Sequence, residues 1–354
     1  MHILKPQQIL FLLMSTKRAR LSNRPNTDDD SMGLRIGVVG CGRWGMNHLN
    51  TLYKLKQNGL IASVHACDID SSRHDEVRQI ADSFHPNWLD LVTRCKLDIV
   101  ALVTPPDTHH SLALAIMDYC KTMFIEKPLG LSQKEASEII AKIQDLGGQL
   151  LIGHILRFNG AIEHAMAMIS HGEIGELEHV EFNRTAARPP PDNPNIFEAM
   201  AIHGIDTACY SFGELEPSTL SVANVALDDN SNPVNTRLVL EFNAGKTASI
   251  DVGWNGVREC RQVTYHGSQG QIIANYGQNT DIVKTNNQGQ RVVIPKSTTP
   301  ALSKEWLTLI ELTNSSTEPY IYPQAQAVIR SVKWVEIANA QIKSVSGDLD
   351  ERIE

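Results

Sequence analysis

The sequence predicts an α/β protein with a doubly wound parallel sheet in its N-terminal part and a mainly antiparallel sheet in a second domain. Between residues 34 and 152, short apolar segments alternate with helix-like segments, as in parallel sheets covered by helices on both faces. Beyond residue 152, strand-like segments separated by turn residues dominate. The 354-residue chain also exceeds the size that one hydrophobic core usually serves.

The individual elements follow from these segments. In the first domain, strands are predicted at 34–39, 61–67, 97–103, 121–125 and 150–152, and helices at 46–52, 71–83, 107–120 and 132–146. In the second, helices are predicted at 159–171 and 323–342, and strands at 177–184, 218–226, 235–243, 246–254, 260–267 and 270–275. We therefore expect domains at 33–152 and 153–345. Residues 1–32 are interpreted as a disordered leader or a start codon assigned too early, and 346–354 as a flexible tail.

Composition narrows the class of protein. The net charge of −8 argues against a nucleic-acid binder, which is normally basic. The six cysteines are scattered without zinc-binding spacing, which indicates reduced thiols. The apolar run at 9–14 is too short to cross a bilayer, and its basic residues follow it instead of preceding it as in a signal peptide. These features predict a cytoplasmic protein without membrane partners.

A glycine motif follows the first strand. Gly40, Gly42 and Gly45 stand in a GxGxxG pattern, between a predicted strand and a predicted helix. Such a turn lets a pyrophosphate approach the backbone and the helix N-terminus. Asp68 ends the second strand, where a carboxylate binds ribose hydroxyls and repels a 2′-phosphate. The pattern predicts NAD, with NADP less favoured, and places Arg43 and Trp44 among the cofactor-binding residues.

Two further segments lie at the carboxyl ends of predicted strands. They begin at Thr104 and at Glu126, and each contains prolines. Ligands bind at that edge of a doubly wound sheet, so we expect both segments to line the cofactor crevice. A lysine there, Lys127, can lose its proton or donate a strong hydrogen bond. The alternative for Lys127 is a structural salt bridge with Glu126 or a solvated charge.

His203 and Asp206 form a second candidate pair. They are three residues apart in an apolar stretch and would share one face of a helix. Histidine is suited to proton transfer near neutral pH. A metal site is the less favoured alternative, because no third ligand is indicated; no metal is predicted.

Together these stretches resemble the glucose–fructose oxidoreductase / inositol dehydrogenase / rhizopine catabolism (Gfo/Idh/MocA) family of NAD(P)-dependent oxidoreductases. The segments GVVGCGRWGMNHL, ACDID, TPPDTHH and MFIEKPLG carry the resemblance, and GHILRFN, IHGIDTACYSFG and HGSQGQIIA extend it to about residue 345. The resemblance implies a Rossmann domain joined to an α/β domain with an open, mostly antiparallel sheet that commonly mediates oligomers, here a homodimer or homotetramer.

The resemblance also implies roles for single residues. Lys127 and His203 would be catalytic and face the reacting hydroxyl, with Asp206 nearby in the substrate site. The residues expected to contact the cofactor, besides the glycine loop and Asp68, are Thr104, Pro106, His109, Glu126, Lys127 and Arg157. The implied reaction is oxidation of a secondary hydroxyl of a sugar, sugar acid or cyclic polyol, either free or nucleotide-linked.

The sequence departs from the family at one position. Many members carry an aspartate four residues before the histidine, where this chain has Ala199. Glu198 would substitute only if the backbone were irregular. The departure keeps open an alternative function, a catalytically silent NAD-binding sensor or regulatory protein.

Two features near the implied substrate site also have two interpretations. Arg188 lies in a proline-rich loop and would bind a carboxylate or phosphate bidentately, or be a solvated surface arginine. Trp254 would stack on a sugar ring or pack in the core.

Overall fold

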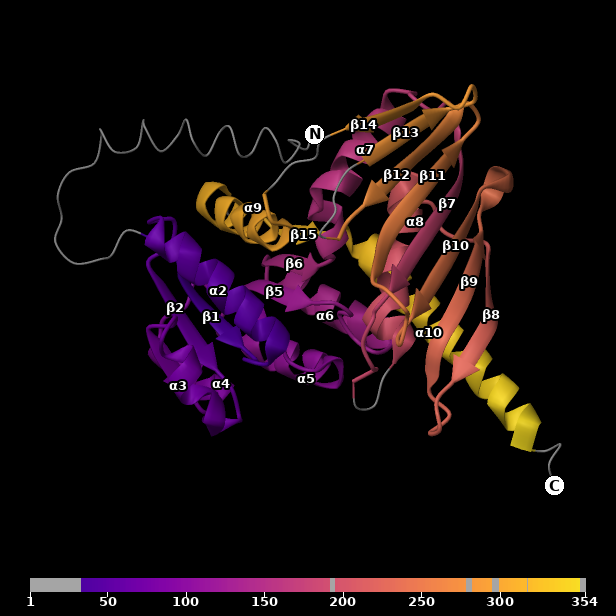
Figure 1. Cartoon of the computed structure of the whole chain (residues 1–354). Helices are drawn as coiled ribbons and strands as arrows, with labels where there is room; N and C mark the ends of the chain where they lie inside the picture. Colours follow the sequence, from indigo (N-terminus) through magenta and orange to yellow (C-terminus); the bar gives the residue numbers. More distant parts are fainter. Residues whose placement is uncertain (1–32, 192–194, 278–281, 295–298, 317, 351–354) are drawn as a thin grey trace. The chain divides into compact units, whose positions relative to one another are not determined.

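The computed structural model describes residues 33–191, 195–277, 282–294, 299–316 and 318–350. The chain divides into two compact units, each described here by itself (Figure 1). The first unit contains the residues up to Glu126 together with Glu138–Gly153 and Leu302–Tyr322. The second contains Lys127–Ser137, His154–Ala301 and the residues from Pro323 onward.

The first unit is built on a parallel sheet. Its strands are β1 (Arg35–Val39), β2 (Ser63–Cys67), β3 (Ser83–His85), β4 (Ile99–Leu102), β5 (Thr122–Glu126), β6 (Gln149–Gly153) and β15 (Tyr320–Tyr322). Among the described residues they form a seven-stranded sheet of order β15-β6-β5-β4-β1-β2-β3 in which every pair is parallel. The helices are α2 (Arg43–Gln57), α3 (His74–Val77), α4 (Trp88–Arg94), α5 (Pro106–Ile116), α6 (Gln133–Asp145) and α9 (Ala301–Ser315), with a 3₁₀ turn η1 (Ser71–Arg73).

The predicted parallel sheet is confirmed. The burial of its central strands explains why they appear in the sequence as continuous apolar segments. Every residue of β4, β5 and β6 is buried, as expected for strands covered on both faces. The helix predicted over 71–83 is wrong: only η1 and α3 form, and the edge strand β3 follows. The Asp82 carboxylate accepts a hydrogen bond from the Val64 N–H and pairs with Lys56. These contacts hold the chain against β2, where it continues as β3.

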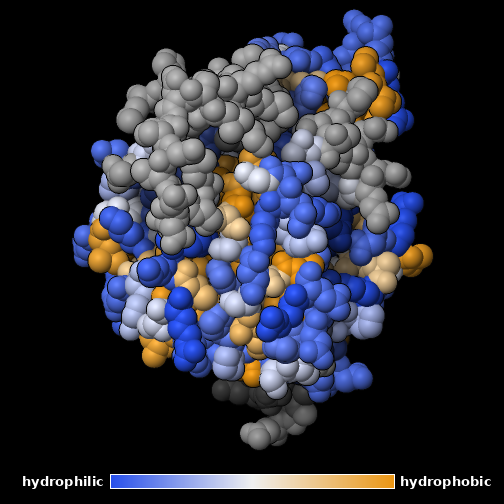
Figure 2. All heavy atoms as spheres, turned by 90° about the vertical axis from the view of Figure 1, so that its left-hand side faces the viewer, coloured by the Kyte–Doolittle hydropathy of each residue, from blue (hydrophilic) through white to orange (hydrophobic). Residues whose placement is uncertain are grey.

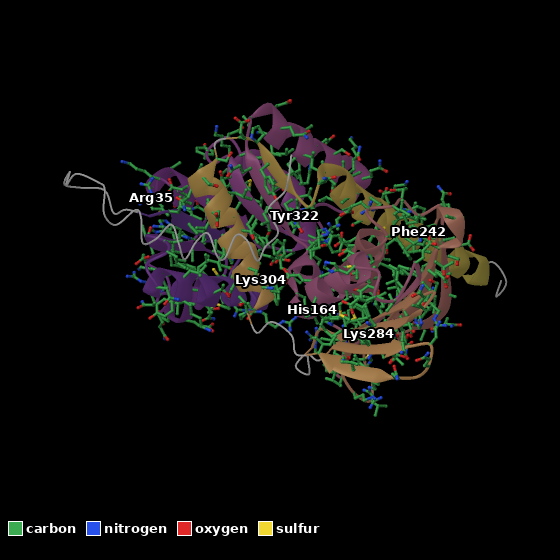
Figure 3. The ribbon with its side chains drawn as sticks, turned by 90° about the horizontal axis from the view of Figure 1, so that it is seen from above. Arg35, His164, Phe242, Lys284, Lys304 and Tyr322 are labelled. Carbon is green, nitrogen blue, oxygen red and sulfur yellow. The ribbon has the colours of Figure 1, made fainter. Side chains whose placement is uncertain are left out.

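Helix α9 and strand β15 were not predicted. They lie far along the chain but return to the first unit, where β15 pairs with β6; Tyr322 of this strand is labelled in Figure 3. Trp306 of α9 is fully buried and stacks on Phe124 of β5 with ring centroids 5.1 Å apart. A three-residue strand and a contact between residues so distant in sequence give no local signal.

The second unit is built on a mostly antiparallel sheet. Its strands are β7 (Leu177–Thr185), β8 (Thr219–Leu227), β9 (Pro233–Glu241), β10 (Thr247–Gly253), β11 (Cys260–Gly267), β12 (Gly270–Asn275), β13 (Ile282–Asn286) and β14 (Arg291–Ile294). The described strands run in the order β14-β13-β12-β11-β7-β10-β9-β8, and only the β10–β7 pair is parallel. Phe242 follows β9 and Lys284 belongs to β13, and both are labelled in Figure 3.

Helices cover one face of this sheet. They are η2 (Ile155–Phe158), α7 (Gly160–Ser170), the π-helix η3 (Phe197–Ala201), α8 (Ile202–Ser211) and α10 (Ala325–Asp350), and the short turn η4 (Asn243–Gly245) connects β9 to β10. Helix α8 packs closely on β7 and β10: a methyl group added at Gly204 would lie 2.6 Å from Ile250 and 2.8 Å from Phe182. The residues of β7 that face α8 are therefore those in line with Phe182.

The predicted antiparallel sheet is confirmed, with additions and one correction. Strands β13 and β14 were not predicted, and α10 continues to Asp350, so the predicted tail is helical at 346–350. The proposed leader 1–32 and residues 351–354 lie outside the described residues. The six cysteines are free thiols, as predicted.

Within the described part of the chain, every helix is too short or too polar to cross a membrane. The face drawn in Figure 2 carries small hydrophobic patches among hydrophilic residues.

Candidate active site

The glycine loop of the first unit has the geometry of a phosphate-binding turn. Gly40 has φ +99°, and a Cβ there would lie 2.6 Å from the Val103 carbonyl oxygen. A Cβ at Gly45 would lie 2.0 Å from the Gly40 oxygen, so this glycine permits α2 to begin close to β1. At Gly42, in contrast, a Cβ would meet nothing within 4 Å. The first and third glycines are therefore required for the turn itself, and the second leaves free space beside its own backbone.

The start of α2 is free to receive an anion. Gly42 is the N-cap, and no side chain caps the helix. The first amide groups of a helix lack partners within the helix and attract negative charge. The loop is fastened from its other side by Asp68, whose carboxylate accepts hydrogen bonds from the N–H groups of Cys41 at 2.6 Å and Asp70 at 2.8 Å. The predicted Asp68 thus stands at the edge of the glycine loop.

The turn after β4 joins the same edge of the sheet. A Cβ at Gly40 would also lie 2.9 Å from the Thr104 nitrogen. Pro106 occupies the first turn of α5, a position where a proline costs no helix hydrogen bond. His109 is fully buried, and its Nε2 lies 2.9 Å from the Thr104 carbonyl oxygen. His109 therefore holds the turn that carries Thr104; direct contact of this imidazole with a cofactor stays a prediction.

Glu126 ends β5 within a network of aromatic donors. Its Oε1 accepts a hydrogen bond from the Trp44 indole at 2.7 Å and lies 3.0 Å from His48 Nε2. The Trp306 indole donates to His48 Nδ1 at 3.2 Å. Because an indole N–H only donates, His48 Nδ1 must be the acceptor and Nε2 must carry the proton. The network therefore presents donors to the Glu126 carboxylate and fixes its orientation.

A second carboxyl lies near this network. Glu305 of α9 is fully buried, and neither of its oxygens has a hydrogen-bond partner among the described residues. The preceding residue, Lys304, is labelled in Figure 3. Burial, together with the charge of Glu126, raises the pKa of Glu305 well above its ordinary value. These effects favour a neutral Glu305 beside an ionised Glu126.

In the second unit, Lys127 is held by an irregular helical turn. Its Nζ donates to the carbonyl oxygens of Glu198 at 3.0 Å and Ala199 at 3.2 Å. Both residues belong to η3, a π-helical turn, a type of turn that is rare and often found at functional sites. The irregular backbone does not turn Glu198 into a free acid, because its Oε1 accepts a hydrogen bond from the Asn195 side chain at 2.6 Å.

His203 follows this turn in α8. His203 is 6% exposed, and no hydrogen bond reaches its ring from the described residues. Burial lowers the pKa of His203 well below its ordinary value, and the charges of Lys127, Arg184 and His154 lower it further. Since these effects disfavour the charged form, His203 is neutral at neutral pH and has a ring nitrogen available to accept a proton.

Asp206 lies on the same helix but serves a different purpose. Its two oxygens accept hydrogen bonds from Arg157 at 2.9 and 2.7 Å, and His154 Nδ1 lies 3.4 Å away. Burial alone would raise the pKa of Asp206, but Arg157 and His154 lower it well below its usual range. Arg157 also donates to Glu214, at 2.6 Å. The predicted cofactor role of Arg157 and substrate role of Asp206 stay predictions, and the structure places both side chains in a buried ion network.

Residues 34–154 match the model of an oxidoreductase family with an NAD-binding Rossmann fold, and residues 162–273 match the model of the GFO/IDH/MocA C-terminal domain. The chain belongs to this oxidoreductase family.

Curated relatives and solved structures agree with this membership. A myo-inositol 2-dehydrogenase of Thermotoga maritima is 28% identical over 273 residues, which cover 73% of this chain and 80% of the relative. A Bacillus subtilis scyllo-inositol 2-dehydrogenase (NAD⁺) is 26% identical over 62% of this chain and 66% of its own length. The solved UDP-N-acetylglucosamine 3-dehydrogenase of Acidithiobacillus ferrooxidans has a TM-score of 0.73 at 21% identity, covering 85% of this chain and 95% of that one.

A Gfo/Idh/MocA oxidoreductase uses a nicotinamide cofactor, and the residues of this chain fit one. The open position at Gly42, the uncapped start of α2 and the carboxylate at the end of β2 are the features that such a dinucleotide requires. No group of three potential metal ligands comes together within the described residues.

Several residues that shape the site escaped sequence reasoning. They are His48, His154, Glu214, Glu305 and Trp306. His48 and His154 stood in stretches that carried the family resemblance but received no role there; the others acquire partners from distant parts of the chain. Arg188 is exposed, and its binding role stays a prediction.

The ion network predicts the consequence of Asp206→Asn. This change leaves the Arg157 guanidinium buried with only part of its charge compensated, which typically costs about 3–5 kcal/mol. We expect the free energy of unfolding, measured by urea titration, to fall by that order. The matched control is Asp251→Asn, which breaks a partly exposed pair with Arg237 and should cost about 1 kcal/mol or less. Equal losses in the two variants would contradict a structural role for Asp206.

Proposed function

We propose that the protein is an NAD-dependent dehydrogenase that oxidises a secondary hydroxyl of a sugar, sugar acid or cyclic polyol. The observation that carries this proposal is the pairing of Lys127, fixed on the carbonyl oxygens of Glu198 and Ala199, with a neutral His203 whose pKa it lowers. The Lys127 ammonium can stabilise negative charge on the substrate oxygen, and the His203 imidazole can accept the proton from that oxygen.

The residues that would hold the cofactor lie in the first unit. The loop from Gly40 to Gly45 and the start of α2 would bind the pyrophosphate, and Asp68 would bind the adenosine ribose. NAD is favoured over NADP because the Asp68 carboxylate is fixed by two backbone N–H groups and would repel a 2′-phosphate. Arg73, the nearest following arginine, lies 3.6 Å from Asp70 in an exposed ion pair. Glu126, oriented by Trp44 and His48, would accept hydrogen bonds from the second ribose.

The remaining chemistry belongs to Lys127 and His203. When bound, the nicotinamide accepts the hydride that leaves the carbinol carbon. As the hydride leaves, the hydroxyl proton must also leave, and the neutral His203 imidazole accepts it. The Lys127 ammonium donates a hydrogen bond to the same oxygen and stabilises the charge that develops on it. Lys127 directly follows Glu126 in the chain, so the proton-handling group is one residue from a cofactor-binding one.

The relatives support the substrate class. The matched proteins include inositol 2-dehydrogenases and a UDP-N-acetylglucosamine 3-dehydrogenase, whose names indicate oxidation of secondary hydroxyls on six-membered rings. The position of the family aspartate holds Ala199, whose methyl group packs against the core of the second unit. In this chain the proton therefore leaves by His203 without a carboxylate at that position. A cytoplasmic homodimer or homotetramer stays a prediction.

Replacing Lys127 tests the proposed chemistry. Lys127→Ala removes the ammonium group, and we expect turnover to fall by about 100-fold or more, the usual contribution of a proton-transfer residue. The measurement is NADH formation by the full chain with a panel of inositols, free sugars, sugar acids and UDP-sugars. The matched control is Lys121→Ala, an exposed lysine that precedes the same strand, β5.

The binding of NADH, followed by its fluorescence, separates the outcomes of this test. A dissociation constant unchanged in Lys127→Ala, with turnover lost, supports the catalytic role. Weakened NADH binding at the same loss of turnover assigns Lys127 to the cofactor instead. No turnover with any compound, with NADH binding intact, contradicts the dehydrogenase proposal and favours a silent sensor.

The electrostatics of His203 give a second prediction. In the wild type, the His203 imidazole should still be neutral at pH 6.5, where an unperturbed imidazole would be half protonated. Lys127→Ala removes a cation that opposes protonation, so the pKa of His203 should rise. Both are measured by NMR titration of ¹⁵N-histidine-labelled protein, with the His203 signal assigned from its absence in His203→Gln. A His203 pKa that Lys127→Ala leaves in place would show that the two groups are not coupled.

A further inference from the structure

Arg184 stands at a position where the helix-covered face of the second sheet turns from apolar to polar. In β7, Val180, Phe182 and Arg184 alternate along one face, and Phe182 contacts the start of α8 at Gly204. The neighbouring strands confirm this orientation: Arg184 is in register with Val252 of β10, which is 2% exposed. A guanidinium therefore continues the row of core side chains toward His203, whose pKa it lowers.

Arg184 lacks the acid that a partly buried guanidinium normally has. No ion pair or side-chain hydrogen bond reaches it from the described residues. Its register partner on β11, Arg261, already pairs with Glu259 at 3.1 Å. Burial lowers the pKa of Arg184, and the charges of Arg261 and Arg188 act in the same direction. Asp206 does not serve as the partner of Arg184, because both of its oxygens accept hydrogen bonds from Arg157.

Two buried donors without partners flank Arg184. Tyr276 follows β12, with its backbone N–H on the Arg261 oxygen, and its ring stacks on Phe182. Its hydroxyl is buried and has no hydrogen-bond partner among the described residues. Trp254 follows Gly253, which pairs with Thr185, and its buried indole N–H is likewise without a partner there. Buried polar groups are normally hydrogen-bonded, so these atoms point to a missing acceptor.

We propose that Arg184, with the Tyr276 hydroxyl and the Trp254 indole N–H, binds a carboxylate or phosphate group of the substrate, so that the sugar or polyol oxidised by this protein is an anion. This inference rests on the proposed dehydrogenase function and narrows its substrate class. An arginine fork suits both anions, because each offers two oxygens in the plane of the guanidinium.

The balance of charge favours an anionic ligand over a neutral polyol. Lys127 and Arg184 both act on His203 as positive charges, and Asp206 acts on it in the opposite direction. A neutral substrate would leave the Arg184 guanidinium without an acidic partner, whereas a carboxylate or phosphate would supply one. The site also places Trp254 beside the ligand as a hydrogen-bond donor, in addition to its place in the core.

The test measures anion binding directly, by calorimetry on the full chain saturated with NADH. Bound NADH occupies the phosphate-binding turn and prevents oxidation of the ligand. The probes are inorganic phosphate, acetate, D-glucose 6-phosphate and D-glucuronate, with D-glucose as the neutral match of the last two. We expect the two charged sugars to bind more tightly than glucose. The relative affinities of glucose 6-phosphate and glucuronate decide between phosphate and carboxylate.

Variants of Arg184 connect this binding to the proposed group. Arg184→Gln should weaken anion binding by about tenfold or more, the scale of a charge-assisted hydrogen bond. The affinity of Arg184→Lys should lie between those of the wild type and Arg184→Gln. The control Arg237→Gln removes an arginine paired with Asp251 on the opposite face of the sheet and should leave binding within about twofold. Melting temperatures confirm that each variant is folded.

The outcomes separate this inference from the proposed function. Absence of anion binding, or equal binding by wild type and Arg184→Gln, overturns the anion site even if neutral sugars are oxidised. Binding that depends on Arg184 in a protein that oxidises no compound of the panel supports the site and contradicts the dehydrogenase. If Arg184 acted only on His203, Arg184→Gln would shift the acid limb of the pH–rate profile for every substrate without a selective rise in KM for anions, and this result also overturns the proposal.

Discussion

The interaction on which the functional account depends is the attachment of the Lys127 ammonium to the backbone of η3. Lysine is a flexible side chain, and a catalytic role requires that its charge be held in one place. The carbonyl oxygens of Glu198 and Ala199 do this without neutralising the charge. Because η3 leads directly into α8, the same backbone positions His203. One irregular turn therefore orders both groups of the proposed proton-transfer pair.

A buried ion network makes this arrangement rigid. Asp206, one turn after His203 in α8, is bound at both oxygens by Arg157, and Arg157 reaches Glu214 at the end of the helix. Arg330 of α10 donates to Glu214 as well. The close packing at Gly204 holds α8 against strands β7 and β10 of the sheet. Asp206 is thus used to hold the helix, and burial, followed by the charges of Lys127, Arg184 and His154, lowers the pKa of His203.

The glycine motif and the central strands could be predicted because their signals are local. A turn that needs Gly40 and Gly45 is visible in the sequence itself, and buried parallel strands appear as continuous apolar runs. Strand β15, the neutral Glu305 and the lack of an acidic partner at Arg184 were not predictable, because each depends on contacts with residues far away in the sequence. These are β6 for β15, Glu126 for Glu305 and strand β10 for Arg184. The π-helix had no sequence signal either, and only the departure at Ala199 drew attention to that segment.

The measurement that tests the account most directly is the turnover of a variant in which Ala199 is deleted. Removing one residue converts the wide turn η3 toward a regular helix and withdraws the two carbonyl oxygens from Lys127, while the side chains of the proposed proton-transfer pair remain. On a substrate identified by the panel, the account predicts that kcat falls by about 100-fold or more, with the dissociation constant of NADH unchanged because the first unit is untouched. A folded deletion variant that retains wild-type kcat would contradict the central claim that this turn positions the catalytic lysine.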